Sequence, residues 1–387
     1  GESMIKAAYL HIPFCEHICH YCDFNKVFLK GQPVDEYLQA LEQEMLLTLN
    51  KYPTEKLQTI FVGGGTPTSL NEKQLERFCE SITRNLPMSR NVEFTFEANP
   101  GDLTIEKLQI LKDAGVNRLS LGVQTFNDDL LEKIGRVHRA KDVYQTVDNA
   151  KSIGFDNISI DLIFSLPTQT INDFMESLAQ AFTLDIQHYS AYSLIIEPKT
   201  VFYNLLQKGK LPQPGEDTEA AMYELLMEQM EKHRFNQYEI SNFSKPGYES
   251  KHNLTYWNND YYYGFGAGAH SYVNGWRRSN AGPLKKYMEL IDSGNLPIFQ
   301  EHQTSKAEQI EEEMFLGLRK ADGVSISHFI GKFEIDPLEI FENEISDLIA
   351  KKWIEVKKDN IYLTKKGRLL GNEVFQSFLG VTNELLS

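Results

Sequence analysis

Three cysteines within eight residues are the part of the sequence with the clearest capacity for chemistry. Cys15, Cys19 and Cys22 follow the spacing C-x3-C-x2-C, whereas Cys79 lies alone in a helical pattern and is expected to be a buried hydrophobe. A chain of 387 residues with 4 cysteines is too large and too poor in cysteine to be a disulfide-stapled secreted domain. Clustered cysteines in such a chain more often bind a metal or perform redox chemistry.

Two kinds of metal centre fit these cysteines. Structural zinc needs four ligands in a closed tetrahedral site, and His17 and His20 could complete such a set. A histidine squeezed between cysteine ligands would, however, strain so short a loop. Three thiolates from one loop suit instead an iron–sulfur cluster with one iron left open. The spacing therefore favours the cluster and leaves zinc as the alternative.

A glycine-rich turn, Gly63-Gly64-Gly65-Thr66-Pro67, ends the predicted strand over 57–63. Glycines without a Cβ let the backbone approach a ligand closely, and proline prevents the strand from continuing. A simple strand-to-helix turn would need one or two glycines rather than three. A second glycine-rich segment, GFGAGAH at 264–270, does not match G-x-G-x-x-G, and we expect a flexible or closely packed turn there.

These segments lie within a regular alternation of strand and helix patterns. Strands are predicted over 7–12, 57–63, 92–98, 116–123, 157–164 and 186–194, with helices over 34–50, 71–85, 104–114, 140–153 and 170–183. Asn71 and Thr104 are expected to cap helices at their N-termini, and Gly115 and Gly154 to end helices. The alternation predicts right-handed βαβ units around a parallel sheet, either an open doubly wound sheet or a curled partial barrel. In both, ligands bind at the C-terminal ends of the strands.

Polar side chains recur at those strand ends. Glu97 ends the third strand, Gln124 ends the fourth, and Asp161 lies on the fifth. Any one of them alone would more often be a surface or capping residue. Together, at successive strand ends, they are expected to converge on one pocket.

The last part of the chain follows another pattern. Helical segments near 305–320, 325–332 and 337–351 precede a hairpin, WIEVKKDNIYLT, and a further helix, an order that resembles a winged helix and suggests DNA. Residues 305–387 hold 11 Lys and Arg against 15 Asp and Glu, a net charge of −4, and the whole chain carries −15. This acidity disfavours nucleic acid and favours a packing or partner-contact domain. No apolar run approaches the roughly 18–20 residues of a membrane span, and no signal peptide opens the chain, so we expect a cytoplasmic protein.

The cysteine motif, with Tyr21 just before its last cysteine, resembles the radical S-adenosylmethionine superfamily. More closely, YLHIPFCEHICHYCDF, VGGGTPTSL, GVQTFNDDLLEKIGRVH and DLIFSLPTQT resemble the oxygen-independent coproporphyrinogen III oxidase group, over residues 7 to about 280. The resemblance implies an α/β fold with a TIM-like partial (β/α)6 barrel over 4–235. It also implies a small α+β extension over 236–300 that contacts heme or porphyrin, and a winged-helix-like domain over 301–387.

The resemblance also assigns the site residues. The three cysteines would hold a 4Fe-4S cluster, and S-adenosylmethionine would chelate its open iron. The residues that match the family's contacts to S-adenosylmethionine are Tyr9, Tyr21, Gly64, Gly65, Thr66, Glu97, Gln124, Arg136 and Asp161. A cationic Arg136 suits the carboxylate of an amino acid. Ile195 would supply at most a backbone or apolar contact.

The same group holds both oxidases and heme chaperones, and three features favour a chaperone. Phe24 stands where the oxidases carry a fourth cysteine, and only a few residues precede the first strand, where the oxidases carry an extension. The chaperones also carry H-N-x-x-Y-W, which is present here from His252 to Trp257. A neutral imidazole can ligate heme iron while aromatic faces pack against the porphyrin, so His252, Tyr256 and Trp257 are expected to contact heme. His270 is a weaker second candidate.

The sequence therefore predicts a heme chaperone that binds heme and a 4Fe-4S cluster with exchangeable S-adenosylmethionine, and that transfers heme to an acceptor protein. The alternative is an oxidase that decarboxylates the propionates of coproporphyrinogen III by radical chemistry; a radical methyltransferase-like enzyme is a remote third. Respiratory acceptors are compatible with peripheral membrane contact, although no anchor is encoded. The acceptor, the heme stoichiometry and the oligomeric state are not encoded in these motifs.

Overall fold

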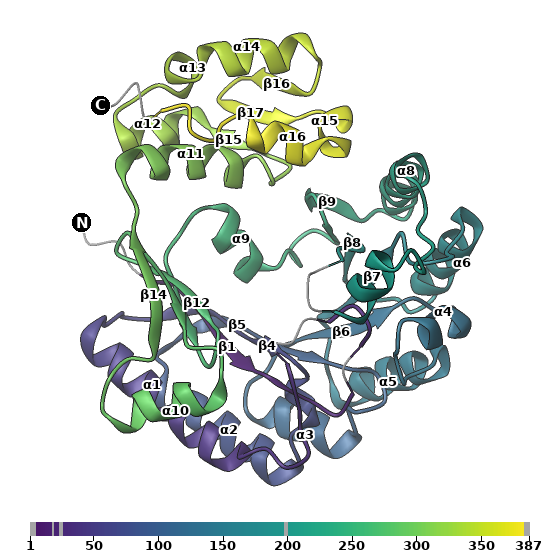
Figure 1. The fold of residues 1–387 in the computed structure, drawn as a ribbon, viewed down its shortest axis with the longest axis vertical. Helices are drawn as coiled ribbons and strands as arrows, with labels where there is room; N and C mark the ends of the chain where they lie inside the picture. The colour runs from purple at the N-terminus through teal and green to yellow at the C-terminus, as the bar shows by residue number, and fades with distance from the viewer. Residues whose placement is uncertain (1–4, 18, 23–25, 197–199, 383–387) are drawn as a thin grey trace.

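The computed structural model describes residues 5–17, 19–22, 26–196 and 200–382 (Figure 1). Phe24, which the sequence analysis compared with the fourth cysteine of the oxidases, lies outside the described residues.

The predicted parallel strands all form. They are β1 (Ala7–Ile12), β4 (Leu57–Gly64), β5 (Met88–Ala98), β6 (Arg118–Gln124), β7 (Ile158–Phe164) and β8 (His188–Ser193), and each pairs in parallel with the next. The predicted connecting helices are α1 (Val34–Lys51), α2 (Glu72–Asn85), α3 (Ile105–Asp113), α5 (Ala140–Ile153) and α6 (Ile171–Phe182). The short η1 (Pro67–Ser69) and α4 (Asp128–Lys133) complete the connections. The repeated βαβ prediction is confirmed.

Local chemistry explains where these helices begin and end. The Asn71 side chain accepts a hydrogen bond from the Gln74 backbone N–H at 2.8 Å, and Thr104 accepts one from Lys107 at 3.2 Å. Each bond satisfies an N–H that has no partner inside its helix. Gly154 ends α5 with φ of 110°, a conformation that costs glycine little.

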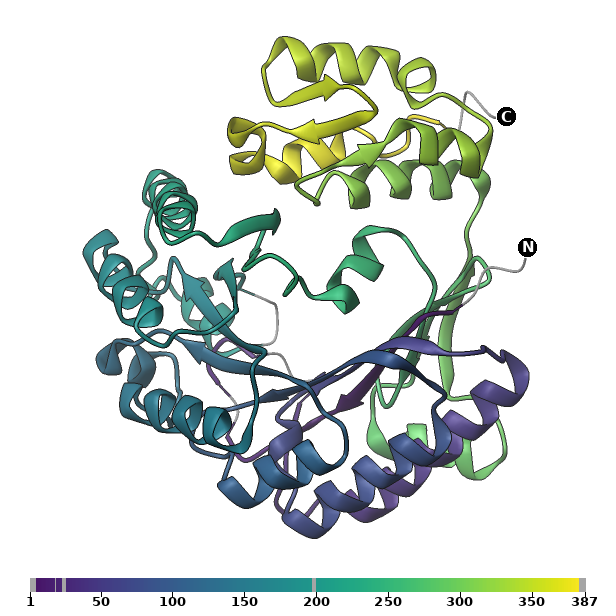
Figure 2. The same cartoon turned by 180° about the vertical axis from the view of Figure 1, so that it is seen from behind.

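The sheet curls around a concave inner face (Figures 1 and 2). Helices α1, α2, α3, α5 and α6 cover its convex face, where Phe96 of β5 contacts Phe78 of α2. Because side chains alternate along a strand, Glu93 and Glu97 of β5 point to the opposite, inner face. The short helix α9 (Lys251–Trp257) lies on that inner face. The sheet is therefore a curled partial barrel, the second of the two architectures that the sequence allowed.

Further strands extend the sheet at both edges. β11 (Tyr262–Phe265) pairs in parallel with β1, and β12 (His270–Val273), β13 (Trp276–Asn280) and β14 (Ile298–Gln303) continue antiparallel, with α10 (Leu284–Asp292) between the last two. Beyond β8 lie β10 (Asn242–Ser244) and β9 (Asn236–Glu239), reached through α7 (Val201–Gln207) and α8 (Glu216–Lys232). Over the described ranges this makes one sheet of 12 strands. Gly264 lies directly against the His270 backbone, which leaves no room for a Cβ, so GFGAGAH is a closely packed turn.

The C-terminal part has its own hydrophobic core, which includes Ile310, Phe329, Phe341 and Phe378. Its elements are α11 (Lys306–Gly317), β15 (Val324–Ser325), α12 (Ile326–Phe333), α13 (Pro337–Ile340), α14 (Glu342–Ala350), β16 (Ile354–Lys357), β17 (Asn360–Leu363), α15 (Lys365–Leu369) and α16 (Gly371–Gln376). This is the predicted order of helices and hairpin, except that the helix expected over 337–351 is broken at Phe341. The limits 4–235, 236–300 and 301–387 stay predictions.

Among the helices that the structure describes, none combines the length and the apolar character that a membrane crossing requires.

Candidate functional site

The cysteine loop leaves the sheet directly after β1 and is held closed at its base. The short strands β2 (Phe14–Cys15) and β3 (Val27–Phe28) pair in parallel on either side of the loop. Cys15 and Cys19 are buried, Cys22 is half-buried, and none of the three forms a disulfide. The backbone N–H of Cys22 donates to the Cys19 carbonyl at 3.1 Å.

Each of the three thiols faces a separate hydrogen-bond donor. Arg136 Nη1 lies 3.6 Å from Cys19 Sγ, Lys26 Nζ lies 3.4 Å from Cys22 Sγ, and Thr66 Oγ1 lies 3.7 Å from Cys15 Sγ. A hydrogen bond with Cys22 and the charge of Arg136 lower the pKa of Cys19 to about 5, against the effect of burial. Because the thiolate is the form that binds metal, these donors favour a metal-ligating loop.

The glycine turn after β4 lies against the base of this loop. The Gly65 backbone N–H donates to the Ile12 carbonyl at 2.7 Å, and the Thr66 N–H donates to the Phe14 carbonyl at 2.8 Å. A Cβ on Gly65 would stand 2.6 Å from the Phe14 oxygen and 2.9 Å from Cys15 Sγ. Gly64 has φ of +121°, and a Cβ there would stand 2.7 Å from the Ile12 oxygen. These positions leave no space for a side chain.

Two carboxylates lie on the strands beyond this turn, Glu97 on β5 and Asp161 on β7. The Glu97 carboxylate rests directly on Gly63. Burial raises the pKa of Glu97 to about 8, and the charge of Asp161 adds to that effect. Burial also raises the pKa of Asp161 to about 6, against the charges of Arg118 and Arg136. Such carboxylates are suited to a cationic ligand, whose charge would stabilise their ionised form.

Arg136 connects the strand ends to the cysteine loop. Its Nη2 donates to Asn99 Oδ1 at 3.1 Å, and Asn99 Nδ2 donates to Thr66 Oγ1 at 2.9 Å. Gly122 of β6 lies at the centre of this group, since a Cβ there would stand 3.3 to 3.4 Å from side-chain atoms of Gln124, Arg136 and Asn99. The predicted convergence of strand-end side chains is therefore present.

The two predicted tyrosines flank the same region. The Tyr9 hydroxyl is 2.9 Å from His11 Nδ1, and its ring stacks on Phe61. Burial raises the pKa of Tyr21 well above its usual range, with the charge of Cys19 adding to the effect. The structure thus places the cysteines and all nine predicted S-adenosylmethionine residues around one region, whereas the Ile195 side chain is 69% exposed.

Three polar residues of this interior were missed by the sequence analysis: Lys26, Asn99 and Arg118. Strand alternation could have found two of them, because Asn99 shares a face with Glu97 and Arg118 shares one with Gln124. Arg118 is 2% exposed, and its Nε has no hydrogen-bond partner among the described residues. Its charge opposes the raised pKa of both inner carboxylates, so it acts as their buried counter-charge.

The H-N-x-x-Y-W segment forms α9, which the sequence analysis did not predict as a helix. Glu93 accepts hydrogen bonds from the backbone N–H groups of Lys251 and His252, at 2.9 and 3.0 Å. His252 is buried, with Nδ1 2.8 Å from Thr59 Oγ1 and Nε2 2.6 Å from the Tyr256 hydroxyl. Burial, with the charge of Arg118, lowers the pKa of His252 to about 3.

This arrangement bears on the expected heme contacts. Both ring nitrogens of His252 are hydrogen-bonded, so neither is free to ligate iron while α9 lies on the inner face. Trp257 lies under Arg319 of the C-terminal domain, with the guanidinium carbon 4.3 Å from the ring centre. The structure therefore does not present His252, Tyr256 and Trp257 as one open heme surface. What it shows is a helix fixed in place by its histidine.

Comparisons with known proteins agree with this geometry. Residues 9–181 match the family model of the radical SAM superfamily, and residues 304–370 match that of the HemN C-terminal domain. The curled parallel sheet, the three-cysteine loop after its first strand and the glycine turn after the next define a radical S-adenosylmethionine protein. Proteins of this class bind a 4Fe-4S cluster and S-adenosylmethionine, and the donors around the thiols and the glycine cradle fit both.

Relatives narrow the class further. The chain is 58% identical to the heme chaperone HemW of Bacillus subtilis (strain 168), over 97% of this chain and 100% of that protein. It is 47% identical to HemW of Lactococcus lactis subsp. lactis, over 97% of each chain, and 30% identical to that of Escherichia coli (strain K12), over 96% and 97%. The chain belongs to the HemW family.

A solved structure confirms the fold. Coproporphyrinogen III oxidase HemN from Escherichia coli superposes with a TM-score of 0.84 at 23% identity, over 97% of this chain and 90% of that one. At this identity the likeness concerns the fold alone.

Proposed function

We propose that this protein is a heme chaperone, which holds heme and passes it to an acceptor protein. The observation that carries the proposal is the 58% identity to a heme chaperone over 97% of this chain and 100% of that protein. The oxidase alternative is supported only by a similar fold at 23% identity.

The cysteine loop would hold the cluster. Cys15, Cys19 and Cys22 would ligate three irons, and the fourth iron would bind the amino-acid end of S-adenosylmethionine. When bound, this pair supplies one-electron reduction of a sulfonium, which is chemistry of the cofactors rather than of the protein. The protein's part is to hold the thiolates, through the donors from Arg136, Lys26 and Thr66.

The strand ends would hold S-adenosylmethionine. The backbone of Gly64 and Gly65 would lie along the ligand, because neither position admits a side chain. Arg136 would pair with the ligand's carboxylate. Glu97 and Asp161 would accept hydrogen bonds from its cationic and hydroxyl groups, and a bound cation would return Glu97 to the carboxylate form. The walls of this S-adenosylmethionine site would be completed by Tyr9, Tyr21, Thr66 and Gln124.

Helix α9 would serve heme binding by position. Because His252 is engaged on both nitrogens, we assign it the role of fixing α9 against β4. The acceptor would be a respiratory heme protein, which would bring this chaperone to the membrane surface.

The proposal is tested with protein reconstituted under anaerobic conditions. Heme titration should give a saturable Soret band, and mixing the loaded protein with a heme-free b-type cytochrome should move that band to the cytochrome. Coproporphyrinogen III, supplied with S-adenosylmethionine and a reductant, should not be oxidised. Absence of heme binding, or turnover above a cluster-free control, would reject the chaperone in favour of the oxidase.

A further inference from the structure

Arg136 is half-buried, and the orientation of its guanidinium decides which of its N–H groups can reach a ligand. We propose that His138 is the positioning residue of this guanidinium, which it directs toward the S-adenosylmethionine site and the cysteine loop. The proposal rests on the S-adenosylmethionine site proposed above, and it adds a residue outside the set that the sequence analysis assigned to that site.

His138 lies between the end of β6 and Arg136, and it is 6% exposed. Its Nε2 is 3.0 Å from the Val123 carbonyl oxygen, and its Nδ1 is 3.3 Å from Arg136 Nε. A carbonyl oxygen can only accept a hydrogen bond, and an arginine Nε–H can only donate one. The ring must therefore carry its proton on Nε2 and accept at Nδ1. Only this neutral tautomer of His138 makes both bonds.

The surroundings of the His138 ring favour its neutral form. Burial lowers the pKa of His138 to about 4, and the charge of Arg136 adds to that effect. A protonated ring would turn an N–H group toward the N–H of Arg136 and lose the bond between them. At neutral pH the imidazole is therefore a fixed acceptor for the guanidinium.

The other contacts of Arg136 show what this acceptor determines. Nη2 donates to the Gly122 carbonyl oxygen and to Asn99 Oδ1, and Nη1 lies 3.6 Å from Cys19 Sγ. With the bond to His138, these contacts among the described residues engage four of the five N–H groups of the guanidinium. The remaining N–H group is on Nη1, the nitrogen that faces Cys19. It is therefore available to the carboxylate of a ligand bound beside the cysteine loop.

The same guanidinium supports two of the three cysteine thiols. Besides its contact with Cys19, it holds Asn99, whose Nδ2 donates to Thr66 Oγ1 at 2.9 Å. Thr66 Oγ1 in turn lies 3.7 Å from Cys15 Sγ. A change in the orientation of the guanidinium would reach both sulfur atoms. His138 therefore acts on the ligand and on the cysteine loop through Arg136.

The backbone around His138 is fixed by contacts that do not use its ring. Arg139 Nη1 lies 3.1 to 3.3 Å from three successive carbonyl oxygens, those of residues 136–138. The backbone N–H of Arg136 donates to the Leu131 carbonyl oxygen at 2.9 Å. The segment should therefore keep its path when the His138 side chain is replaced, so that a variant reports on the guanidinium.

Three variants of His138 separate the two bonds of its ring. In Asn the amide oxygen can take the place of Nδ1 and accept from Arg136. In Gln the amide nitrogen can take the place of Nε2 and donate to Val123, whereas Phe can make neither bond. A positioning role predicts that Asn preserves ligand binding and Gln does not. A role limited to anchoring the segment on β6 predicts the reverse.

Binding is measured by equilibrium dialysis of labelled S-adenosylmethionine, with full-length protein reconstituted to the same iron content. His138→Phe and His138→Gln should each weaken binding about tenfold or more, since each loses a hydrogen bond to a charged group. His138→Asn should bind within about threefold of the unchanged protein, because it keeps that bond. His328→Phe is the control, at a side chain that is 68% exposed on α12, and its binding should be unchanged.

A double-mutant cycle tests whether His138 acts through Arg136. Arg136→Lys keeps a cation but places no Nε–H against His138. In that background His138→Phe should change binding by less than about twofold. The Asn and Gln variants decide the proposal if the Arg136→Lys background binds too weakly to titrate.

Three results would overturn the proposal: unchanged binding in His138→Phe, rescue by Gln rather than by Asn, or an undiminished effect of His138→Phe in the Arg136→Lys background. In each case the unchanged protein still binds S-adenosylmethionine, so the proposed site stands. Failure of the unchanged, reconstituted protein to bind S-adenosylmethionine would reject that site instead.

Discussion

At the scale of single residues, the three cysteines differ from Cys79 in what surrounds them. Cys15, Cys19 and Cys22 each face a donor, while Cys79 lies on α2 within the hydrophobic core. Donors stabilise the thiolate, which is the form that binds metal, and an apolar site does not. The four cysteines therefore divide into three ligands and one core residue.

Replacing the cysteines one at a time tests this division. Cys15→Ala, Cys19→Ala and Cys22→Ala should each remove the broad visible absorbance of the reconstituted cluster and lower bound iron from about four atoms, since an open-site cluster has only three protein ligands. Cys79→Ala, the matched control, should keep both. Loss of the cluster in Cys79→Ala would show that the site draws on a fourth cysteine.

The glycine turn gives a second prediction at this scale. Gly65→Ala should abolish S-adenosylmethionine binding and destabilise the cluster, because its Cβ would stand 2.9 Å from Cys15 Sγ and 2.6 Å from the Phe14 oxygen. Gly215→Ala is the control, since a Cβ there meets nothing within 4 Å and φ is −72°. Binding is measured by equilibrium dialysis of labelled S-adenosylmethionine. Equal binding by both variants would mean that the turn does not contact the ligand.

Spacing and residue type made the cysteines and the glycine turn predictable, because each motif is short and continuous in sequence. Lys26 and Asn99 were not predicted, since their roles depend on the Cys22 thiol and the Thr66 hydroxyl that the fold brings close to them. The hydrogen bonding of the His252 ring could not be predicted from the sequence either. Its partner Thr59 lies 193 residues away, and nothing in H-N-x-x-Y-W indicates that both ring nitrogens are used.

At the scale of elements, Glu44 ties α1 to the extension of the sheet. Its Oε1 accepts hydrogen bonds from the Gly266 backbone N–H at 2.7 Å and from the Tyr287 hydroxyl at 2.6 Å, and its Oε2 accepts one from Asn280 at 2.8 Å. Glu44 is 2% exposed, and burial raises its pKa from 4.5 to about 7. Three elements therefore meet at one titratable carboxyl group.

This carboxyl group predicts a pH dependence of stability. Between pH 4.5 and about 7 the folded state holds a proton on Glu44 that the unfolded state has released, so stability falls as pH rises through this window and levels off above it. The loss should be on the order of 2–3 kcal/mol. Urea unfolding from pH 5 to 8 should show this fall in the unchanged protein, relative to Glu44→Gln. A pH-independent difference between the two would contradict the assignment.

Strands and helices were predictable where their hydrophobic pattern extends over many residues. The parallel strands and the helices between them were found within a few residues of their limits, because buried strands and amphipathic helices have a clear period. Helix α9 was missed, since it has 7 residues and depends on Glu93 and on the inner face of the barrel. The strands β11–β14 were missed because they are short, and they extend the sheet from β1 through the pairing of β11 with that strand.

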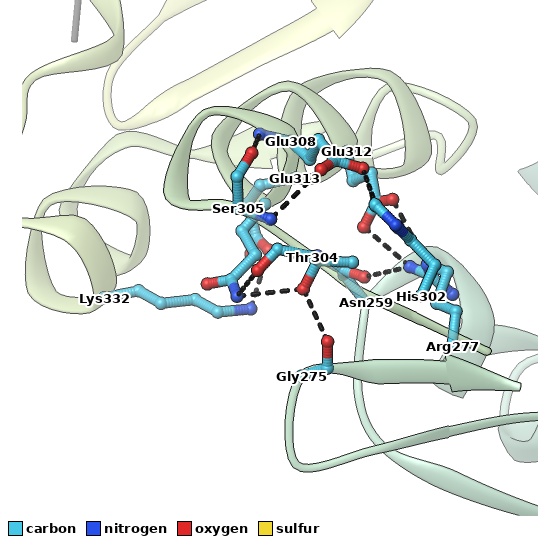
Figure 3. A network of polar contacts seen from close by, with 11 residues as sticks. Asn259, Gly275, Arg277, His302, Thr304, Ser305, Glu308, Glu312, Glu313 and Lys332 are labelled. Atoms are coloured by element: carbon cyan, nitrogen blue, oxygen red, sulfur yellow. Dashed lines mark hydrogen bonds and ion pairs between the residues drawn. The ribbon is translucent and has the colours of Figure 1, made fainter. Parts of the chain in front are cut away.

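At the scale of the whole molecule, the C-terminal domain is joined to the barrel at several points. The Ile240 N–H donates to the Arg319 carbonyl at 3.0 Å, and the Ala321 N–H donates to the Tyr238 carbonyl at 2.9 Å. Near the end of β14, Asn259 donates to Glu313 of α11 at 3.1 Å, and Lys332 of α12 lies 2.7 Å from the same carboxylate (Figure 3). The segment after α9 is thus bonded to the C-terminal domain.

Arg319 is the cation at the centre of this junction. Its guanidinium lies 4.3 Å from the ring centre of Trp257 and 5.4 Å from that of Phe375, so it is placed between α9 and α16. Its charge opposes the rise in the pKa of Glu239 that burial causes, and Glu239 is 2% exposed. Removing Arg319 would leave that carboxylate without this buried counter-charge, which costs more than the loss of an exposed ion pair.

Arg319→Ala should therefore weaken the attachment of the C-terminal domain by about 2–3 kcal/mol, from a lost cation–π contact and an uncompensated buried carboxylate. Because this domain has a separate core, calorimetry should show its unfolding as an earlier, resolved transition, and limited proteolysis should cut sooner near Thr304. Arg84→Ala is the control. Arg84 also pairs with a carboxylate, that of Glu42, but its own side chain is 60% exposed. Identical melting and cleavage in the two variants would show that Arg319 does not join the domains.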